Sequence, residues 1–148
     1  MRTVIVDGHP DDLEKVKNIL SDMEIELEIA GTASDGRAGY KLIVKERPDL
    51  IITDVHLPGM NGLTMLKKLG SEQIRAKVLI LTGNQDFSEA RQAIALGVDQ
   101  YLLKPVKKNQ VRHAVAQIAE KLAQEQAMEE TFTVENIFAA CLNGRNGK

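Results

Sequence analysis

The sequence predicts an α/β fold in which a five-stranded parallel sheet is covered by helices on both faces. Short apolar runs alternate with amphipathic stretches five times along the 148 residues. This alternation is typical of parallel strands joined by crossover helices. The runs are apolar throughout, which indicates strands that are buried on both faces. We therefore expect a doubly wound sheet with five helices.

Each predicted strand is brief, apolar and bounded by turn or charged residues. Short connections between strands and helices are expected, as in other compact α/β units. In chain order, the five runs are Val4–Val6, Leu27–Ala30, Leu50–Ile52, Val78–Leu81 and Tyr101–Leu103.

The stretches that follow the strands carry apolar residues at the spacings of one helix face. Asp11 and Glu14 resemble a capping pair at the start of the first helix. Gly70 and Gly97 are expected to end the third and fourth helices. The fifth helix could continue toward Gln126 as a linker or a dimer contact. The apolar positions are Leu13, Val16, Leu20 and Met23; Ala38, Leu42 and Ile43; Leu63 to Leu69; Ala90, Ala93 and Ile94; and Val111, Val115, Ile118 and Leu122.

The pattern changes after Gln126, so we predict one domain over residues 1–126 and a linker, or the start of a missing output domain, over 127–148. An apolar stripe predicts a short extra helix that ends at Asn143-Gly144 and needs a surface to cover. The last residues, from Gly144 to Lys148, are polar and suggest a chain cut from something longer. The stripe consists of Val134, Ile137, Phe138, Cys141 and Leu142.

Bulk composition limits the function classes. The net charge of −2 lacks the excess of basic residues that binding to a nucleic-acid backbone requires, so DNA contact is expected only through another domain. The single cysteine, Cys141, cannot form an internal disulfide and belongs to no zinc-site spacing. No apolar run is long enough to cross a membrane or to form a signal-peptide core. We expect a cytoplasmic protein without membrane contact.

The polar residues that follow the strands define a candidate site. In open parallel sheets, ligands bind beyond the carboxyl ends of the strands. With strand order 2-1-3-4-5, Asp7 and Asp54 face each other there, with Thr82 and Lys104 alongside. Two close carboxylates favour a cation such as Mg²⁺, which also attracts phosphate. A carboxylate can attack phosphorus to give an aspartyl phosphate, while the metal and Lys104 offset the charge on the phosphoryl oxygens.

Four segments then resemble the receiver domain of two-component response regulators: VIVDGHP (Val4–Pro10), ITDVHLPGMNG (Ile52–Gly62), ILTG (Ile80–Gly83) and ALGVDQYLLKP (Ala95–Pro105). The resemblance covers Arg2 to about Ala123 and implies a CheY-like, flavodoxin-like fold. It implies that Asp54 is the phosphoacceptor, that Asp7, Asp54 and the backbone carbonyl of His56 bind Mg²⁺, and that Lys104 binds the phosphoryl group.

The resemblance also implies how the signal leaves the site. Thr82 would move toward the phosphoryl oxygens, and Tyr101 would turn inward. These movements reshape the face formed by the fourth helix, fifth strand and fifth helix, which could also pair with a second copy. The implied partner is a sensor histidine kinase, and the Lys104–Pro105 peptide is expected to be cis. The segment Asp86–Pro105 and the tail near Phe138 are similar to receivers fused to AraC-type DNA-binding domains.

One residue departs from the family pattern. Receiver domains usually carry two adjacent acids after the first strand, whereas the second position here is Gly8. Mg²⁺ requires near-octahedral oxygen ligation, so the loss of one carboxylate should weaken its binding. Asp11 and Asp12 could lend a carboxylate through water, and His9 could approach the site. The two acids are, however, already explained as charges at a helix start.

Three functions follow as hypotheses. The first is a phosphoryl-accepting receiver, which is a switch rather than an enzyme with a small-molecule substrate. The second, suggested by Gly8, is a pseudo-receiver that binds proteins without phosphorylation. The third is a flavin- or nucleotide-binding enzyme on the same sheet topology. The sequence disfavours the third because no glycine-rich phosphate cradle follows the first strand and aromatic residues make up only 3% of the chain. His56 and His113 belong to no cluster, so both side chains are expected in solvent.

Overall fold

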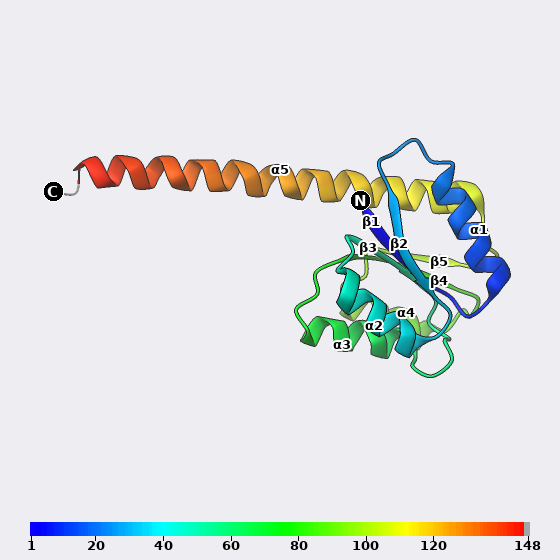
Figure 1. Cartoon of the computed structure of the whole chain (residues 1–148). Coiled ribbons are helices and arrows are strands. Elements are labelled where there is room, and N and C mark those ends of the chain that lie inside the picture. The colour runs from blue at the N-terminus through cyan, green and yellow to red at the C-terminus, as the bar shows by residue number, and fades with distance from the viewer. Residues whose placement is uncertain (147–148) are drawn as a thin grey trace. The chain divides into compact units, whose positions relative to one another are not determined.

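A computed structural model describes residues 1–146; for 132–133 and 142–146 it describes the helical backbone alone. Leu142 of the expected stripe, Gly147 and Lys148 therefore lie outside the described side chains. Strands and helices alternate along the chain (Figure 1). The elements are β1 (Arg2–Val6), α1 (Pro10–Ser21), β2 (Glu28–Ala33), α2 (Gly36–Glu46), β3 (Leu50–Thr53), α3 (Gly62–Ser71), β4 (Lys77–Thr82), α4 (Phe87–Ala95), β5 (Gln100–Leu103) and α5 (Lys108–Asn146).

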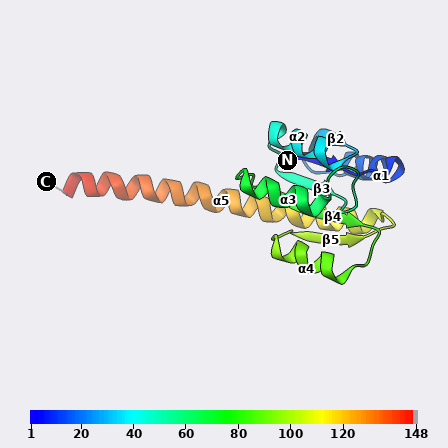
Figure 2. The ribbon, with the colours of Figure 1, turned by 90° about the horizontal axis from the view of Figure 1, so that it is seen from below.

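The sheet confirms the predicted topology. Its five strands are parallel and follow the order β2-β1-β3-β4-β5. Helices α2, α3 and α4 lie side by side on one face, and α1 lies with the first turns of α5 on the other (Figures 1 and 2). The order in which strands are added to the sheet reverses at β1, because β2 lies on one side of it and β3 on the other. The carboxyl ends of β1 and β3 therefore face a crevice that can receive a ligand.

The prediction that every strand is buried on both faces is correct only for the centre of the sheet. Strand β3 is wholly buried, and β1 is buried from Thr3 onward. The edge strands β2 and β5 are mostly half-exposed, because each has a neighbour on one side alone. Strand β2 also extends to Ala33, beyond the expected end at Ala30, because Val4, Ile5 and Val6 pair with Gly31, Thr32 and Ala33. Backbone pairing therefore extends β2 past its apolar run.

Helix termini agree with part of the prediction. Helix α4 gives way to Gly97, which has a φ of 77°, as expected for a glycine after a helix. Helix α3 passes through Gly70 and ends at Ser71. The expected capping pair at Asp11 and Glu14 is wrong, because α1 starts at Pro10 with His9 as its N-cap residue. Asp11 and Asp12 lie in the first turn, where acidic charge is favourable.

The region after Gln126 differs from the prediction. In place of a separate short helix that ends at Asn143-Gly144, α5 continues unbroken to Asn146. Residues 1–116 and 117–148 form two units by internal contacts, and we describe each by itself. Within the second unit, Met128, Val134, Ile137 and Phe138 are between 61% and 71% exposed. Among residues 1–146, no helix combines the length and apolarity that crossing a bilayer requires.

Candidate functional site

Backbone hydrogen bonds hold the predicted site residues at the carboxyl edge of the sheet. The Asp7 amide donates to the Ala33 carbonyl at 3.0 Å, and the Asp54 amide donates to the Val6 carbonyl at 3.0 Å. The Lys104 amide donates to the Thr82 carbonyl at 2.7 Å. Each bond extends the strand ladder by one residue. The sheet itself therefore places the two acids and the lysine at one edge.

The two carboxylates are buried and held in defined orientations. The side chains of Asp7 and Asp54 are each about 3% exposed. Asp54 Oδ1 accepts from the backbone amides of Val55 at 2.7 Å and His56 at 3.3 Å. Asp7 Oδ1 accepts from the His9 amide at 2.9 Å. These bonds offset part of the desolvation of each carboxylate, and they leave Asp54 Oδ2 directed toward the lysine.

Lys104 joins the two acids to a third. Its Nζ lies 2.8 Å from Asp54 Oδ2, 3.0 Å from Asp7 Oδ2 and 2.9 Å from Asp12 Oδ2. The lysine side chain is 10% exposed, so it does not extend into solvent from the strand end. Burial by itself lowers the pKa of Lys104, but hydrogen bonds to the three carboxylates outweigh burial and raise the pKa above its ordinary value. The lysine is therefore held as an ammonium ion.

Thr82 and Tyr101, the two residues of the predicted switch, lie on the neighbouring strands β4 and β5. Thr82 is fully buried at the end of β4, and Tyr101 is half-buried on the neighbouring strand β5. The hydroxyl oxygen of Tyr101 is buried and has no hydrogen-bond partner among the described residues. Burial raises the pKa of this phenol, and three nearby carboxylates raise it further. The Lys104–Pro105 peptide is cis, as expected. Movement of Thr82 and Tyr101 on phosphorylation stays a prediction.

Sequence reasoning undervalued two members of the site, His9 and Asp12. The sequence favours Asp12 as a helix-start charge over a water-mediated role at the site, yet its carboxylate contacts Lys104 directly. His9 Nδ1 lies 3.3 Å from Asp7 Oδ1 and 3.8 Å from Asp54 Oδ2. The available signal was position, because His9 directly precedes α1 and Asp12 lies in its first turn, both shortly after Asp7.

Gly8 has little free space around it. A Cβ atom built there would lie 3.1 Å from Pro58 Cδ and 3.3 Å from the Ser34 carbonyl oxygen. These contacts are tight, but a shift of a few tenths of an ångström would relieve them. The missing acid is therefore not excluded by the backbone. The pocket lacks this carboxylate because residue 8 is a glycine. The shape of the pocket does not exclude it.

The residues present fit a divalent cation, although with fewer carboxylates than expected. Asp7, His9 and Asp54 each offer one ligand atom, and these atoms all lie within 4.8 Å of one another. Two carboxylate oxygens, with the His56 carbonyl as a predicted further ligand, match the oxygen preference of Mg²⁺, which usually keeps several waters and takes one or two protein carboxylates. Within the described residues, this group is the one that could hold a metal.

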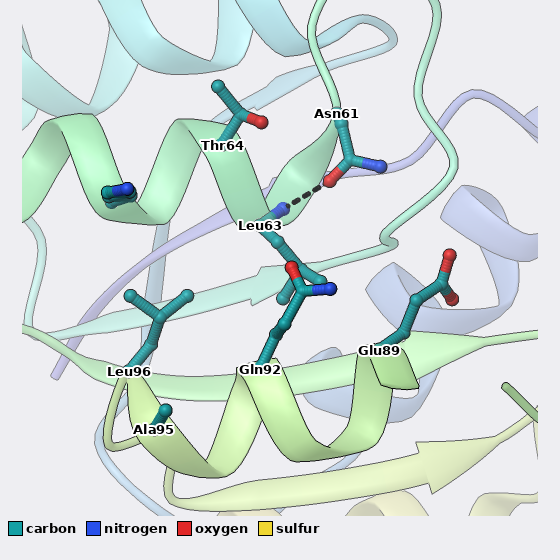
Figure 3. Close-up of a pocket in the computed structure, with 8 residues that line it drawn as sticks. Asn61, Leu63, Thr64, Glu89, Gln92, Ala95 and Leu96 are labelled. Atoms are coloured by element: carbon teal, nitrogen blue, oxygen red, sulfur yellow. Dashed lines mark hydrogen bonds between the residues drawn. The ribbon is translucent and has the colours of Figure 1, made fainter. Parts of the chain in front are cut away.

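A second hollow lies beside the site between α3 and α4. It has a volume of about 500 Å³ and is open along one side. Figure 3 shows Asn61 and Glu89 at one end and Leu96 with Ala95 at the other. Glu89 also bonds His56 Nε2 at 3.1 Å, so the exposed His56 ring has a partner that the sequence did not suggest. His113 is exposed, as expected.

Comparisons with known proteins agree with this geometry. A family model described as the response regulator receiver domain matches residues 3–116. The receiver domain of AraT, a response regulator from Geobacillus stearothermophilus, superposes with a TM-score of 0.79 and 34% identity, covering 84% of this chain and 97% of that one. The chain therefore belongs to the receiver-domain family of response regulators.

Two curated relatives are transcriptional or response regulators. The nitrate/nitrite response regulator protein NarL of Escherichia coli (strain K12) is 32% identical over 130 residues, which cover 88% of this chain and 58% of NarL. The transcriptional regulatory protein YesN of Bacillus subtilis (strain 168) is 32% identical over 110 residues, 74% of this chain and 30% of YesN. The chain thus spans roughly a third to three fifths of the length of these relatives.

Proposed function

We propose that this receiver domain accepts a phosphoryl group on Asp54 from a partner sensor histidine kinase, with the help of a divalent cation. The observation that carries the proposal is the contact of Lys104 Nζ with both Asp54 Oδ2 and Asp7 Oδ2, at 2.8 Å and 3.0 Å. The ammonium stands beside the oxygen that would attack phosphorus. It can therefore stabilise the negative charge of the phosphoryl group as it arrives.

The residues of the pocket have separate roles in the proposed phosphoryl transfer. Backbone amides hold Asp54 Oδ1, so that Oδ2 is left as the nucleophilic oxygen. Asp7 and Asp54 would hold the cation, which supplies positive charge between the carboxylates and the phosphoryl oxygens. Lys104 would bind a phosphoryl oxygen, and Thr82 would hydrogen-bond another. The chain would act as a switch, catalysing at most its own phosphorylation and dephosphorylation.

The surface formed by α4, β5 and the first turns of α5 is the proposed route of the signal. Phe87 and Ile94 of α4 are 79% and 76% exposed, and Leu103 of β5 is 36% exposed. Large apolar side chains in solvent favour a partner surface. We propose that an output domain or a second copy of the chain contacts this surface. DNA binding would belong to the output domain, and the protein would act in the cytoplasm. The regulators among the relatives, each longer than this chain, support this assignment.

The test is the mass of the intact protein after incubation with Mg²⁺ and a small phosphodonor. We expect one phosphoryl adduct on the natural protein and none on Asp54→Asn. Asp99→Asn is a matched control, because Asp99 is bound to the backbone at the opposite end of β4. It should still form the adduct. An adduct that persists in Asp54→Asn would contradict Asp54 as the acceptor.

A pseudo-receiver remains the second candidate, and one observation favours it. The ammonium of Lys104 contacts all three of Asp7, Asp12 and Asp54, and so already supplies one positive charge among these carboxylates. If no adduct forms under any donor or metal, while the α4–β5–α5 surface still binds a partner, the chain is a protein-binding module.

A further inference from the structure

The pocket includes one side chain, His9, whose ring nitrogen is a kind of metal ligand that Mg²⁺ does not favour. His9 Nδ1 lies 3.3 Å from Asp7 Oδ1 and 3.8 Å from Asp54 Oδ2. Two atoms bound to one ion at about 2.1 Å lie about 3.0 to 3.5 Å apart in octahedral or tetrahedral geometry. The first separation falls in this range, and the second needs a shift of a few tenths of an ångström. The imidazole is therefore close to a ligating position already.

Lys104 marks the place where positive charge is stabilised. Its Nζ is within hydrogen-bond distance of the same three atoms: 3.2 Å from Asp7 Oδ1, 2.8 Å from Asp54 Oδ2 and 3.4 Å from His9 Nδ1. The ammonium thus already occupies a point that two carboxylates and a ring nitrogen share. This contact is independent of the ligand geometry, and it shows that the three groups converge on one cation.

The chemistry of the three groups decides which ion suits them. Mg²⁺ takes oxygen ligands almost exclusively, and Gly8 removes one of the expected carboxylates. Imidazole nitrogen suits Zn²⁺, Ni²⁺, Cu²⁺ and Fe²⁺, which bind nitrogen and oxygen ligands more tightly than Mg²⁺ does. A set of two carboxylates and one imidazole therefore favours a transition metal.

We propose that the Asp7–His9–Asp54 pocket binds a divalent transition-metal ion in preference to Mg²⁺, with His9 Nδ1 as a direct ligand. The inference deepens the proposed function by naming the class of cation at the same site, and it rests on that function for the role of Asp54. His9 is 64% exposed, so its ring can turn toward the ion without disturbing the core. Nearby Asp12, 4.0 Å from His9 Nδ1, can pair with Lys104 when the lysine is displaced.

The test measures Zn²⁺ and Mg²⁺ binding by titration calorimetry on the unphosphorylated protein. All samples carry Cys141→Ser, which removes the exposed thiol as a competing Zn²⁺ ligand. We expect Zn²⁺ to bind at least about tenfold more tightly than Mg²⁺. His9→Ala should weaken Zn²⁺ binding by about tenfold or more and leave Mg²⁺ binding within about twofold. Asp7→Asn should remove the Zn²⁺ site.

Two controls make the result specific. His113→Ala removes another exposed histidine, outside the pocket, and should change neither affinity. In NMR spectra, Zn²⁺ should shift the imidazole signals of His9 and leave those of His113 in place. The inference is overturned if Zn²⁺ binding survives His9→Ala unchanged, if Mg²⁺ loses the same factor, or if Mg²⁺ binds as tightly as Zn²⁺.

The metal titration and the phosphorylation test can fail separately. Unchanged metal affinities in His9→Ala, together with an Asp54 adduct, would overturn the inference and leave the proposed function standing. Zn²⁺ binding that depends on His9, without an adduct under any metal, would support the inference and contradict the proposed function.

Discussion

Lys104 shows how much of the site depends on one side chain. Its ammonium contacts the carboxylates of Asp7, Asp12 and Asp54 at 2.8 to 3.0 Å, and the lysine side chain is only 10% exposed. Buried carboxylates repel one another unless a cation or a proton lies between them. The raised pKa of Lys104 keeps that cation in place up to strongly alkaline pH. A metal ion that enters the pocket must therefore compete with, or displace, a cation that the protein carries itself.

Gly8 gives a direct prediction at the same scale. Gly8→Asp should raise Mg²⁺ affinity by about tenfold, because it adds a carboxylate beside Asp7 and Asp54. The Cβ contacts with Pro58 and Ser34 are tight enough to require a small shift and no more. Magnesium titration monitored by NMR or calorimetry measures the change.

Gly8→Asn is the matched control for this substitution. It has nearly the same size as Gly8→Asp without the charge, so it should raise Mg²⁺ affinity much less. Equal affinities for the two variants would show that the charge at position 8 is not what limits Mg²⁺ binding.

At the scale of elements, the start of α3 is fixed against the loop that follows β3 and carries Asp54. Gly62 opens α3, and its amide donates to the Val55 carbonyl at 2.7 Å. A Cβ atom at position 62 would lie 2.1 Å from the Asp54 carbonyl oxygen. The helix can approach the strand end this closely only because residue 62 has no side chain. The loop that carries Asp54 and His56 is held by this approach.

Gly62→Ala should therefore lower the free energy of unfolding by about 3 kcal/mol, because backbone must move on both sides of the contact. Gly70→Ala in the same helix is the control. A Cβ at position 70 meets nothing within 4 Å, so this change should be neutral or stabilising by about 0.5 to 1 kcal/mol. Urea denaturation of both variants measures the difference. Equal stabilities would contradict the close approach.

At the scale of the whole molecule, the core and the helical tail differ in burial. The buried core of the first unit comprises residues of the sheet and its covering helices, from Val4 to Val115. Large apolar side chains beyond it, such as Met128 and Phe138, are mostly exposed. Burial of apolar surface is the main source of stability, so the two regions should contribute unequally to folding.

Removal of residues 127–148 should consequently change the free energy of unfolding by less than about 0.5 kcal/mol. Denaturation followed by circular dichroism, corrected for the lost helical signal, measures this. Because the exposed apolar side chains leave with the tail, binding of a hydrophobic dye should also fall. A loss of stability of several kcal/mol would show that the tail covers part of the core.

The sequence by itself determined the alternation of strands and helices and the positions Asp7, Asp54, Thr82 and Lys104, because buried strands and their ends leave a readable pattern of apolar runs. The strand order came with the resemblance to receiver domains. Only the tertiary structure decided the edge-strand burial, the length of β2, the unbroken α5, and the approach of His9 and Asp12 to Lys104. These features depend on backbone pairing and on the spatial meeting of residues far apart in sequence. A residue pattern does not encode such contacts locally, since Lys104 is separated from His9 and Asp12 by most of the chain.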